Sequence, residues 1–177
     1  MSKHLLYIGF CLLLLAISSC DSPVSSKSEL FYEIFIDESS VFRKLEPADP
    51  MDKVLDTEKS IPAHSDDIGI VYEIKLPSGY LLYLDYWSDN INSLDPENKI
   101  ASIVANILIN EEVETAKLYD EILNYFSEEY GVVNGSYGDY SWEGITQKST
   151  AMGIYLKLDE NKKAITLNFV DTEPNNR

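Results

Sequence analysis

Residues 68–88 read IGIVYEIKLPSGYLLYLDYWS, and this stretch decides the fold class of the chain. Apolar residues alternate with other residues over 68–76, which is the period of a β-strand that buries one face. Pro-Ser-Gly at 77–79 is a turn signal. Residues 80–88 alternate again and are dense in tyrosine and tryptophan, which favour strands. The stretch therefore predicts an antiparallel hairpin.

Helices are predicted on both sides of this hairpin. Asp49, followed by a proline, is typical of a helix cap and predicts a helix over 50–59. Asn110 is the predicted cap of a longer helix, whose apolar residues recur at helical spacing until Gly131 ends it. Residues 30–37 are apolar on both alternations, which leaves a buried strand and a short helix as alternatives.

The remaining strands complete a repeating order of elements. Alternation predicts them at 99–109, 139–146, 151–159 and 163–170. The order is then helix and three strands, twice, with a period of about 60 residues, and Glu-Asn-Lys precedes the last strand of each half. We expect an α+β domain over 30–171, a tandem α-β-β-β repeat (about 30–110 and 111–171) with an antiparallel sheet and helices on one face. Residues 172–177 are expected to fray.

The N-terminal segment carries an export pattern. After a positively charged start comes an apolar run of about 13 residues, which is too short to span a membrane as a helix but suits a signal peptide. The run ends in Ile17-Ser18-Ser19-Cys20, which resembles the lipobox of bacterial lipoproteins. The resemblance implies a cleaved signal over 1–19 and a covalent lipid of the palmitate type on Cys20. Residues 20–29 then form a polar, serine-rich tether.

Composition limits the partners of the domain. Cys11 leaves with the signal, so the mature domain has no disulfide to stabilise it. The formal net charge is −16, and loss of Lys3 with the signal makes it about −17. Nucleic acid is therefore not an expected partner, because binding it requires clustered Lys and Arg. The acidity favours a basic protein partner; the alternative is that it only keeps an exported protein soluble.

Few residues have the pattern of a catalytic or metal site. His64 is the only histidine after the signal and lies in a polar stretch, where a solvated loop residue is expected. No serine stands in a nucleophile turn, so we expect no enzyme and no cofactor besides the lipid. Calcium prefers oxygen ligands, which makes a weak candidate set of Asp85, Asp89, Asp95 and Glu97, with a solvated acidic loop as the alternative. Paired carboxylates for glycoside hydrolysis remain open.

Aromatic side chains give the candidate partner-binding residues. Such residues dominate binding hot spots, and they gather in the strand at 80–88 and in the glycine-rich segment 131–144. If helices cover one face of the sheet, aromatic residues on the other face form an exposed platform. For two of them, Tyr140 and Trp142, packing beneath the long helix is the alternative. The candidates are Tyr83, Trp87, Tyr137, Tyr140 and Trp142.

The predicted element order resembles two families. One is the β-lactamase inhibitor proteins, built from two helix-plus-sheet repeats, and the other is the SmpA/OmlA-type outer-membrane lipoproteins, which carry one such unit behind a lipobox. The resemblance is one of topology and transfers no site residues. It implies an inhibitor or immunity-type protein-binding module in the cell envelope, on the periplasmic side of the inner or outer membrane or exposed at the surface. Alternatives are a structural accessory of outer-membrane assembly and a carbohydrate-binding protein or hydrolase.

Overall fold

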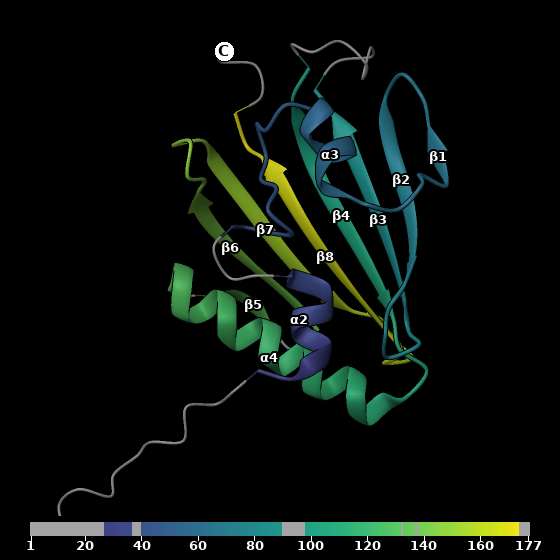
Figure 1. The fold of residues 1–177 in the computed structure, drawn as a ribbon. Coiled ribbons are helices and arrows are strands. Elements are labelled where there is room, and N and C mark those ends of the chain that lie inside the picture. The colour runs from purple at the N-terminus through teal and green to yellow at the C-terminus, as the bar shows by residue number, and fades with distance from the viewer. Residues whose placement is uncertain (1–26, 37–39, 90–97, 132, 137, 174–177) are drawn as a thin grey trace, which may run out of the picture.

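The fold is one open antiparallel sheet with helices on one side of it (Figure 1). The computed structural model describes residues 27–36, 40–89, 98–131, 133–136 and 138–173. Eight strands follow the order β1-β2-β3-β4-β8-β7-β6-β5, with every neighbouring pair antiparallel. The strands are β1 His64–Ser65, β2 Gly69–Lys75, β3 Leu81–Ser88, β4 Ile100–Leu108, β5 Asn134–Ser136, β6 Asp139–Ile145, β7 Ala151–Leu158 and β8 Ala164–Asp171. The predicted α+β class and antiparallel sheet are confirmed.

The sheet consists of two meanders that meet at its centre. Strands β1 to β4 form one meander and β5 to β8 the other, and β4 pairs with β8 where they join. Each meander therefore has four strands, one more than predicted. The additional strands, β1 and β5, are the two edge strands. With two and three residues they are too short to show an alternation in the sequence.

The stretch with two alternative predictions is a helix, α2 (Glu29–Phe35). The Ser28 hydroxyl accepts a hydrogen bond from the backbone N–H of Phe31 (3.2 Å), which caps the helix. The side chains of Leu30, Phe31, Ile34 and Phe35 are buried, and their spacing fits one helical face. Ser28 itself donates through its backbone N–H to the Glu121 carboxylate (3.2 Å), which ties the start of α2 to the long helix.

The second helix is shorter than predicted. Helix α3 covers Asp52–Thr57 instead of 50–59, and Asp49 is not its cap. The buried Asp49 carboxylate instead accepts hydrogen bonds from the backbone N–H of Glu46 (2.9 Å) and the Lys53 ammonium (2.8 Å), and it pairs with Lys148. The prediction of a cap was wrong because this carboxylate binds the preceding turn at Glu46 and the distant Lys148, and the local pattern shows neither contact.

The long helix α4 covers Glu112–Tyr130. It ends before Gly131, whose φ of 81° is favourable for glycine, as predicted. The helix begins one residue later than predicted, because Glu111 and not Asn110 holds the capping position. The reason is that Ile109 still donates a hydrogen bond to Lys163 across the sheet (2.9 Å), so the chain leaves β4 later.

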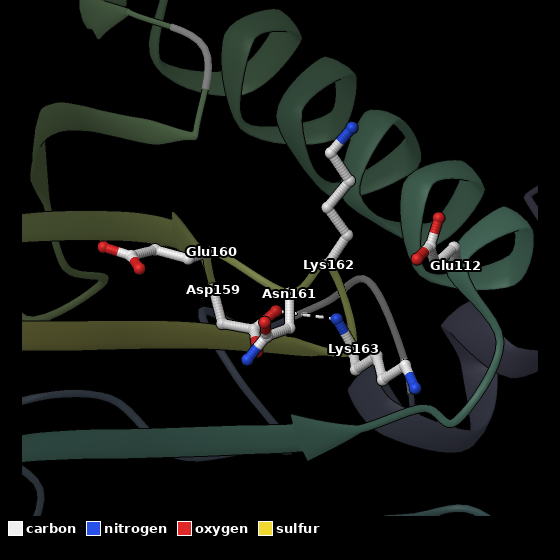
Figure 2. A pocket seen from close by; sticks show the side chains of 6 residues that line it. All are labelled: Glu112, Asp159, Glu160, Asn161, Lys162 and Lys163. Atoms are coloured by element: carbon white, nitrogen blue, oxygen red, sulfur yellow. Dashed lines mark hydrogen bonds between the residues drawn. The ribbon is translucent and has the colours of Figure 1, made fainter.

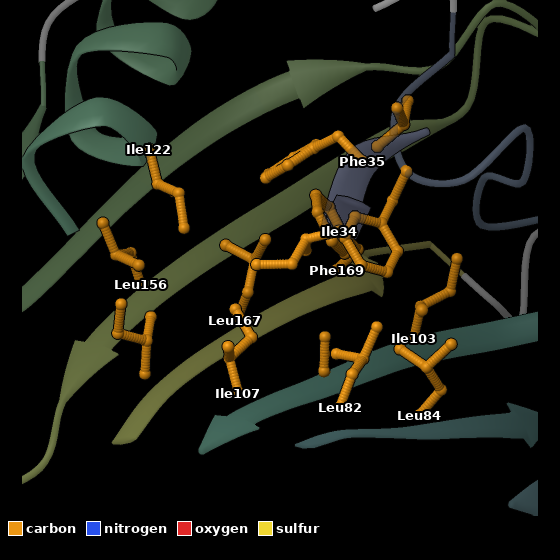
Figure 3. Packing of buried hydrophobic residues seen from close by; sticks show 14 of the residues in the cluster. Ile34, Phe35, Leu82, Leu84, Ile103, Ile107, Ile122, Leu156, Leu167 and Phe169 are labelled. Carbon is orange, nitrogen blue, oxygen red and sulfur yellow. The ribbon is translucent and has the colours of Figure 1, made fainter. Parts of the chain in front are cut away.

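The hydrophobic core lies between the helices and one face of the sheet (Figure 3). The strand register places one buried residue of each central strand in a continuous row: Tyr72, Leu84, Ala105, Leu167 and Leu156. Ile122 of α4 and Phe35 of α2 point toward this face, and both are fully buried. All three described helices lie on this side (Figure 1).

A buried polar cluster locks the segment between α2 and β2 onto the sheet. The Arg43 guanidinium donates two hydrogen bonds to the Glu58 carboxylate, at 2.9 and 2.8 Å, and a third to the carbonyl of Ile34 (3.1 Å). The Tyr86 hydroxyl donates to Glu58 as well (2.6 Å). Arg43, Glu58 and Tyr86 are all buried, so these bonds form where water does not compete.

Within the described residues, no helix is both long and apolar enough to cross a membrane.

Candidate partner-binding face of the sheet

The face of the sheet opposite the helices has no covering element among the described residues (Figure 1). We call it the open face. Side chains alternate between the two faces along each strand, so the residues between the core positions belong to it. Most of them are half-buried or exposed. Its central members are Val71, Glu73, Tyr83, Asp85, Trp87, Ser102, Val104, Asn106, Ser141, Glu143, Gly153, Tyr155, Lys157, Thr166, Asn168 and Val170.

Two aromatic rings on the open face lie over glycines. A Cβ atom on Gly69 would stand 3.4 Å from Cε3 of Trp87, and one on Gly153 would stand 3.0 Å from Cε2 of Tyr155. Glycine in a strand permits this close approach of a ring to the backbone. The rings remain accessible, since Trp87 is 39% exposed and Tyr155 is 46% exposed. The open face therefore presents aromatic surface on β3 and on β7, the strands that flank the central β4–β8 pair.

Asp85 lies in an apolar frame on the open face. Tyr83 and Trp87 precede and follow it on the same face of β3, and Val71 and Val104 stand opposite it on the two neighbouring strands. Among the described residues, the Asp85 carboxylate has no hydrogen-bond or ion-pair partner. Burial raises the pKa of Asp85 above its ordinary value, because a partly desolvated carboxylate is less stable as an anion.

Other polar groups on the open face are partly satisfied. The Thr166 hydroxyl donates a hydrogen bond to the Asn106 side-chain oxygen (2.9 Å) across the central strand pair. The side-chain oxygen of Asn168 is buried and has no hydrogen-bond partner among the described residues. Four carboxylates (Glu73, Asp85, Asp139 and Glu143) and two lysines (Lys75 and Lys157) lie on this face. The face therefore combines aromatic surface, unmet acceptors and an excess of negative charge.

The structure separates the aromatic residues singled out from the sequence. Tyr83 and Trp87 lie on the open face. Trp142 lies on the helix-covered face, is 2% exposed and contacts Phe126, with ring centroids 5.5 Å apart. Its ring is inaccessible to a partner, so Trp142 is removed from the candidate set because it packs beneath α4.

Tyr140 also points to the side of α4. Its ring stacks on that of Tyr119, with centroids 6.3 Å apart, and it is half-buried. It is therefore not on the same surface as Trp87. Tyr137 and Cys20 lie outside the described residues. The sequence reasoning did not include Tyr155, although the short pattern Gly153-x-Tyr155 places a glycine and a ring two positions apart on one face of a strand.

The acidic residues considered for calcium are not brought together where the structure describes them. Asp85 lies in β3 and Asp89 directly follows its last residue, four positions further on, which separates them by about 13 Å. Asp89 is engaged at the strand end, where its side chain accepts a hydrogen bond from the backbone N–H of Lys99 (3.0 Å). Asp95 and Glu97 lie outside the described residues. The part of the chain that the structure describes contains no group of three or more potential metal-ligating side chains.

His64 is exposed in the edge strand β1 rather than in a loop. Its Nε2 lies 3.1 Å from an Asp66 carboxylate oxygen. The expectation of solvent exposure is confirmed and the expectation of a loop is wrong, because residues 64 and 65 pair with the start of β2.

One hollow lies at the β7–β8 hairpin and the start of α4 (Figure 2). It has a volume of about 580 Å³ and is lined by Glu112 and the hairpin residues 159–163. Figure 2 shows the Asp159 carboxylate accepting a hydrogen bond from the backbone of Lys163 (2.6 Å). This carboxylate shapes the tight turn, so we assign the hollow a structural origin. A second hollow of about 520 Å³ continues the open face beside Tyr155 and Glu143.

Comparison with known proteins returned no match: no protein-family description, no curated protein and no solved structure is significantly similar to this chain.

Proposed function

We propose that this chain is a lipid-anchored protein of the bacterial cell envelope that binds a basic partner protein on the open face of its sheet. The observation that carries the proposal is the open face itself. Aromatic residues there remain accessible, at 39% for Trp87 and 46% for Tyr155, although they lie on the central area of an eight-stranded sheet. Exposed apolar patches with a polar surround are typical of interaction sites.

The charge supports a basic partner. The chain carries a formal net charge of −16, and the open face has an excess of carboxylates over lysines. A negatively charged face speeds the encounter with a positively charged partner and disfavours partners that are themselves negative. An inhibitor or immunity-type role, in which the domain covers a basic envelope enzyme or toxin, fits this chemistry best. Nucleic acid does not fit as a ligand, because a polyanion binds to a positively charged protein surface and this chain is acidic.

The anchor in this proposal is a lipid on Cys20, after removal of residues 1–19. The support is the motif Ile17-Ser18-Ser19-Cys20 behind an apolar run of signal-peptide length. Mass spectrometry of the N-terminal peptide tests it: we expect Cys20 at the mature N-terminus with acyl chains attached. An unmodified Cys20 in the membrane-purified protein would refute the anchor and leave the open-face proposal standing.

We also propose that the two halves of the sheet are a tandem α-β-β-β repeat, each with an added edge strand. The hairpins β2–β3 and β6–β7 match in detail, with strands of 7 and 8 residues in each. Their turns carry the same hydrogen bonds: Leu76 N–H to Tyr80 C=O and Gly79 N–H to Leu76 C=O in one, Thr146 to Thr150 and Ser149 to Thr146 in the other. The fourth turn residue has a positive φ in both, at Gly79 and Ser149.

A carbohydrate-binding role is the second candidate. The observation in its favour is that the rings of Trp87 and Tyr155 lie over glycines, and that their partners on the neighbouring strands, Ser102 and Asn168, are polar. Rings so placed offer their faces for stacking on a sugar. Saturable binding of envelope glycans, lost in Trp87→Ala and Tyr155→Ala, would support this role over the protein-binding one.

The experiment for the main proposal is affinity capture with the full-length chain. A C-terminally tagged chain is purified from membranes in mild detergent and offered envelope extracts at low and at moderate salt. We expect one basic protein in near-equal amounts, with less recovered at moderate salt because screening weakens the attraction. Capture of acidic or outer-membrane assembly proteins only, or of nothing above background, would contradict the proposal.

A further inference from the structure

Asp85 has an unusual environment for a surface carboxylate. Its four nearest neighbours on the open face are all apolar or aromatic: Tyr83 and Trp87 along β3, Val71 on β2 and Val104 on β4. All four frame residues lie in paired strands, and the register between β3 and β4 shifts directly after Trp87. The carboxylate at its centre has no donor among the described residues. We call these five residues the Asp85 frame.

The frame restricts what can cover it. A purely apolar partner surface would bury the Asp85 charge without a partner, which is strongly unfavourable. A second copy of this chain would bring another surface of a chain with a net charge of −16, so self-association by this face is opposed as well. The occupant must bring a positively charged donor to the centre of the frame and apolar surface to its rim.

An arginine side chain meets both requirements. Its guanidinium forms two parallel hydrogen bonds with a carboxylate, and its planar face stacks on aromatic rings. Side chains two residues apart on one strand face stand about 7 Å apart, so a cation on Asp85 lies near the range of about 6 Å for cation–π attraction to either ring. A lysine ammonium can meet the charge but cannot make the paired, planar contact.

We propose that the Asp85 frame is the receptor for an arginine side chain of the partner protein, with the Asp85 carboxylate binding the guanidinium and Tyr83 and Trp87 flanking it. This inference rests on the proposed function, since it names the chemistry by which the open face recognises its partner. It makes Asp85 and the two rings the specificity-determining residues of that face.

The test uses the isolated side chain as a probe, so it does not depend on knowing the partner. The full-length chain in detergent is titrated with N-acetyl-arginine amide and, in parallel, with its neutral analogue N-acetyl-citrulline amide. The chain has two tryptophans, so its NMR spectrum contains two indole N–H signals, which a Trp142→Phe variant assigns. Trp142 is buried beneath α4 and serves as the internal control.

We expect the arginine probe to shift the Trp87 indole signal in a saturable way and leave the Trp142 signal unchanged. The citrulline probe should bind about tenfold more weakly, because a neutral hydrogen bond replaces a charge-assisted one. The Asp85→Asn variant should bind the arginine probe about tenfold more weakly than the wild type does. Glu143→Gln, which removes a charge from the same face outside the frame, should bind like the wild type.

Three results would overturn the inference: no arginine-dependent shift of Trp87, equal shifts with both probes, or unchanged binding in Asp85→Asn. Equal losses in Asp85→Asn and Glu143→Gln would show general charge attraction and would overturn it too. The proposed function fails separately. If capture from extracts fails while the arginine titration succeeds, the arginine-binding chemistry of the frame stands and the partner-protein proposal falls. If capture succeeds while the titration fails, the open face binds its partner without using Asp85.

Discussion

Substitution of Glu58 by glutamine tests the buried cluster that fastens the N-terminal segment to the sheet. Glutamine keeps the shape of the side chain and still accepts a hydrogen bond from the Tyr86 hydroxyl, which lies 2.6 Å from Glu58. It removes the charge that pairs with Arg43, whose guanidinium is 2.8 Å away and 8% exposed. Arg43 then remains buried with only carbonyl partners, such as Ile34 at 3.1 Å.

The expected loss of stability is large. Removal of one partner from a buried ion pair costs about 3–5 kcal/mol, because the remaining charge is uncompensated. Since carbonyl oxygens still accept from Arg43, we place Glu58→Gln at the lower end, about 3 kcal/mol. Urea unfolding followed by circular dichroism measures this: with a typical slope of about 2 kcal/mol/M, the midpoint falls by about 1.5 M.

A second variant separates the charge from the packing. Arg43→Met in the Glu58→Gln background removes the unpaired charge and retains a flexible apolar side chain. We expect it to recover much of the lost stability, as replacements of complete buried ion pairs often do. A loss below about 1 kcal/mol for Glu58→Gln would refute the account of the cluster, as would a double variant that is less stable than the single one.

Three further predictions concern the core and two titrating groups. Phe126→Ala should lower the free energy of unfolding by about 3–5 kcal/mol, because the ring is fully buried between α4 and the sheet; a loss within 1 kcal/mol of zero would contradict this. Asp85→Asn should stabilise the domain at pH 7, because burial raises the folded-state pKa of Asp85 above the 3.8 of an unfolded aspartate. The protonated carboxyl therefore stabilises the fold, fully below pH 3.8, and this stability is lost as the pH rises through the folded-state pKa. Equal urea midpoints for wild type and Asp85→Asn at pH 7 would argue against the desolvated frame. Burial and the Glu58 charge raise the pKa of Tyr86 well above 10.0, so its contribution is complete below pH 10 and is lost as pH rises toward the folded-state value; urea midpoints measured at increasing alkaline pH should fall less in Tyr86→Phe than in the wild type.

Most of the sheet could be predicted from the sequence because its strands bury one face. The alternation in 68–76 and 80–88 gives strands within one or two residues of β2 and β3. Edge strands β1 and β5 are too short to carry a period, so they were missed. Residues 30–37 could not be assigned, because apolar residues at every position are compatible with both a helix and a strand; the contacts of Phe31 and Phe35 with Tyr125 of α4 accompany the helical form.

Caps and binding residues depend on contacts that local patterns do not contain. Asp49 has the sequence context of a helix cap, but its partner Lys148 lies far along the chain. Trp87 and Trp142 are both candidate binding residues in the sequence. One lies on the open face and the other beneath α4, because the register of each strand decides the face. The apolar frame around Asp85 comes from three strands and is visible only once they are paired.

The central claim is that a partner protein binds the open face, and the most direct measurement is the affinity of the captured partner for variants of opposite faces. Titration calorimetry compares the wild type with Trp87→Ala and Tyr155→Ala, on the open face, and with Val113→Ala, which is 78% exposed on α4. The account predicts a loss of about tenfold or more for each open-face variant, as for hot-spot aromatic residues, and no change for Val113→Ala. Unchanged affinity in both open-face variants, or a loss confined to Val113→Ala, would contradict it.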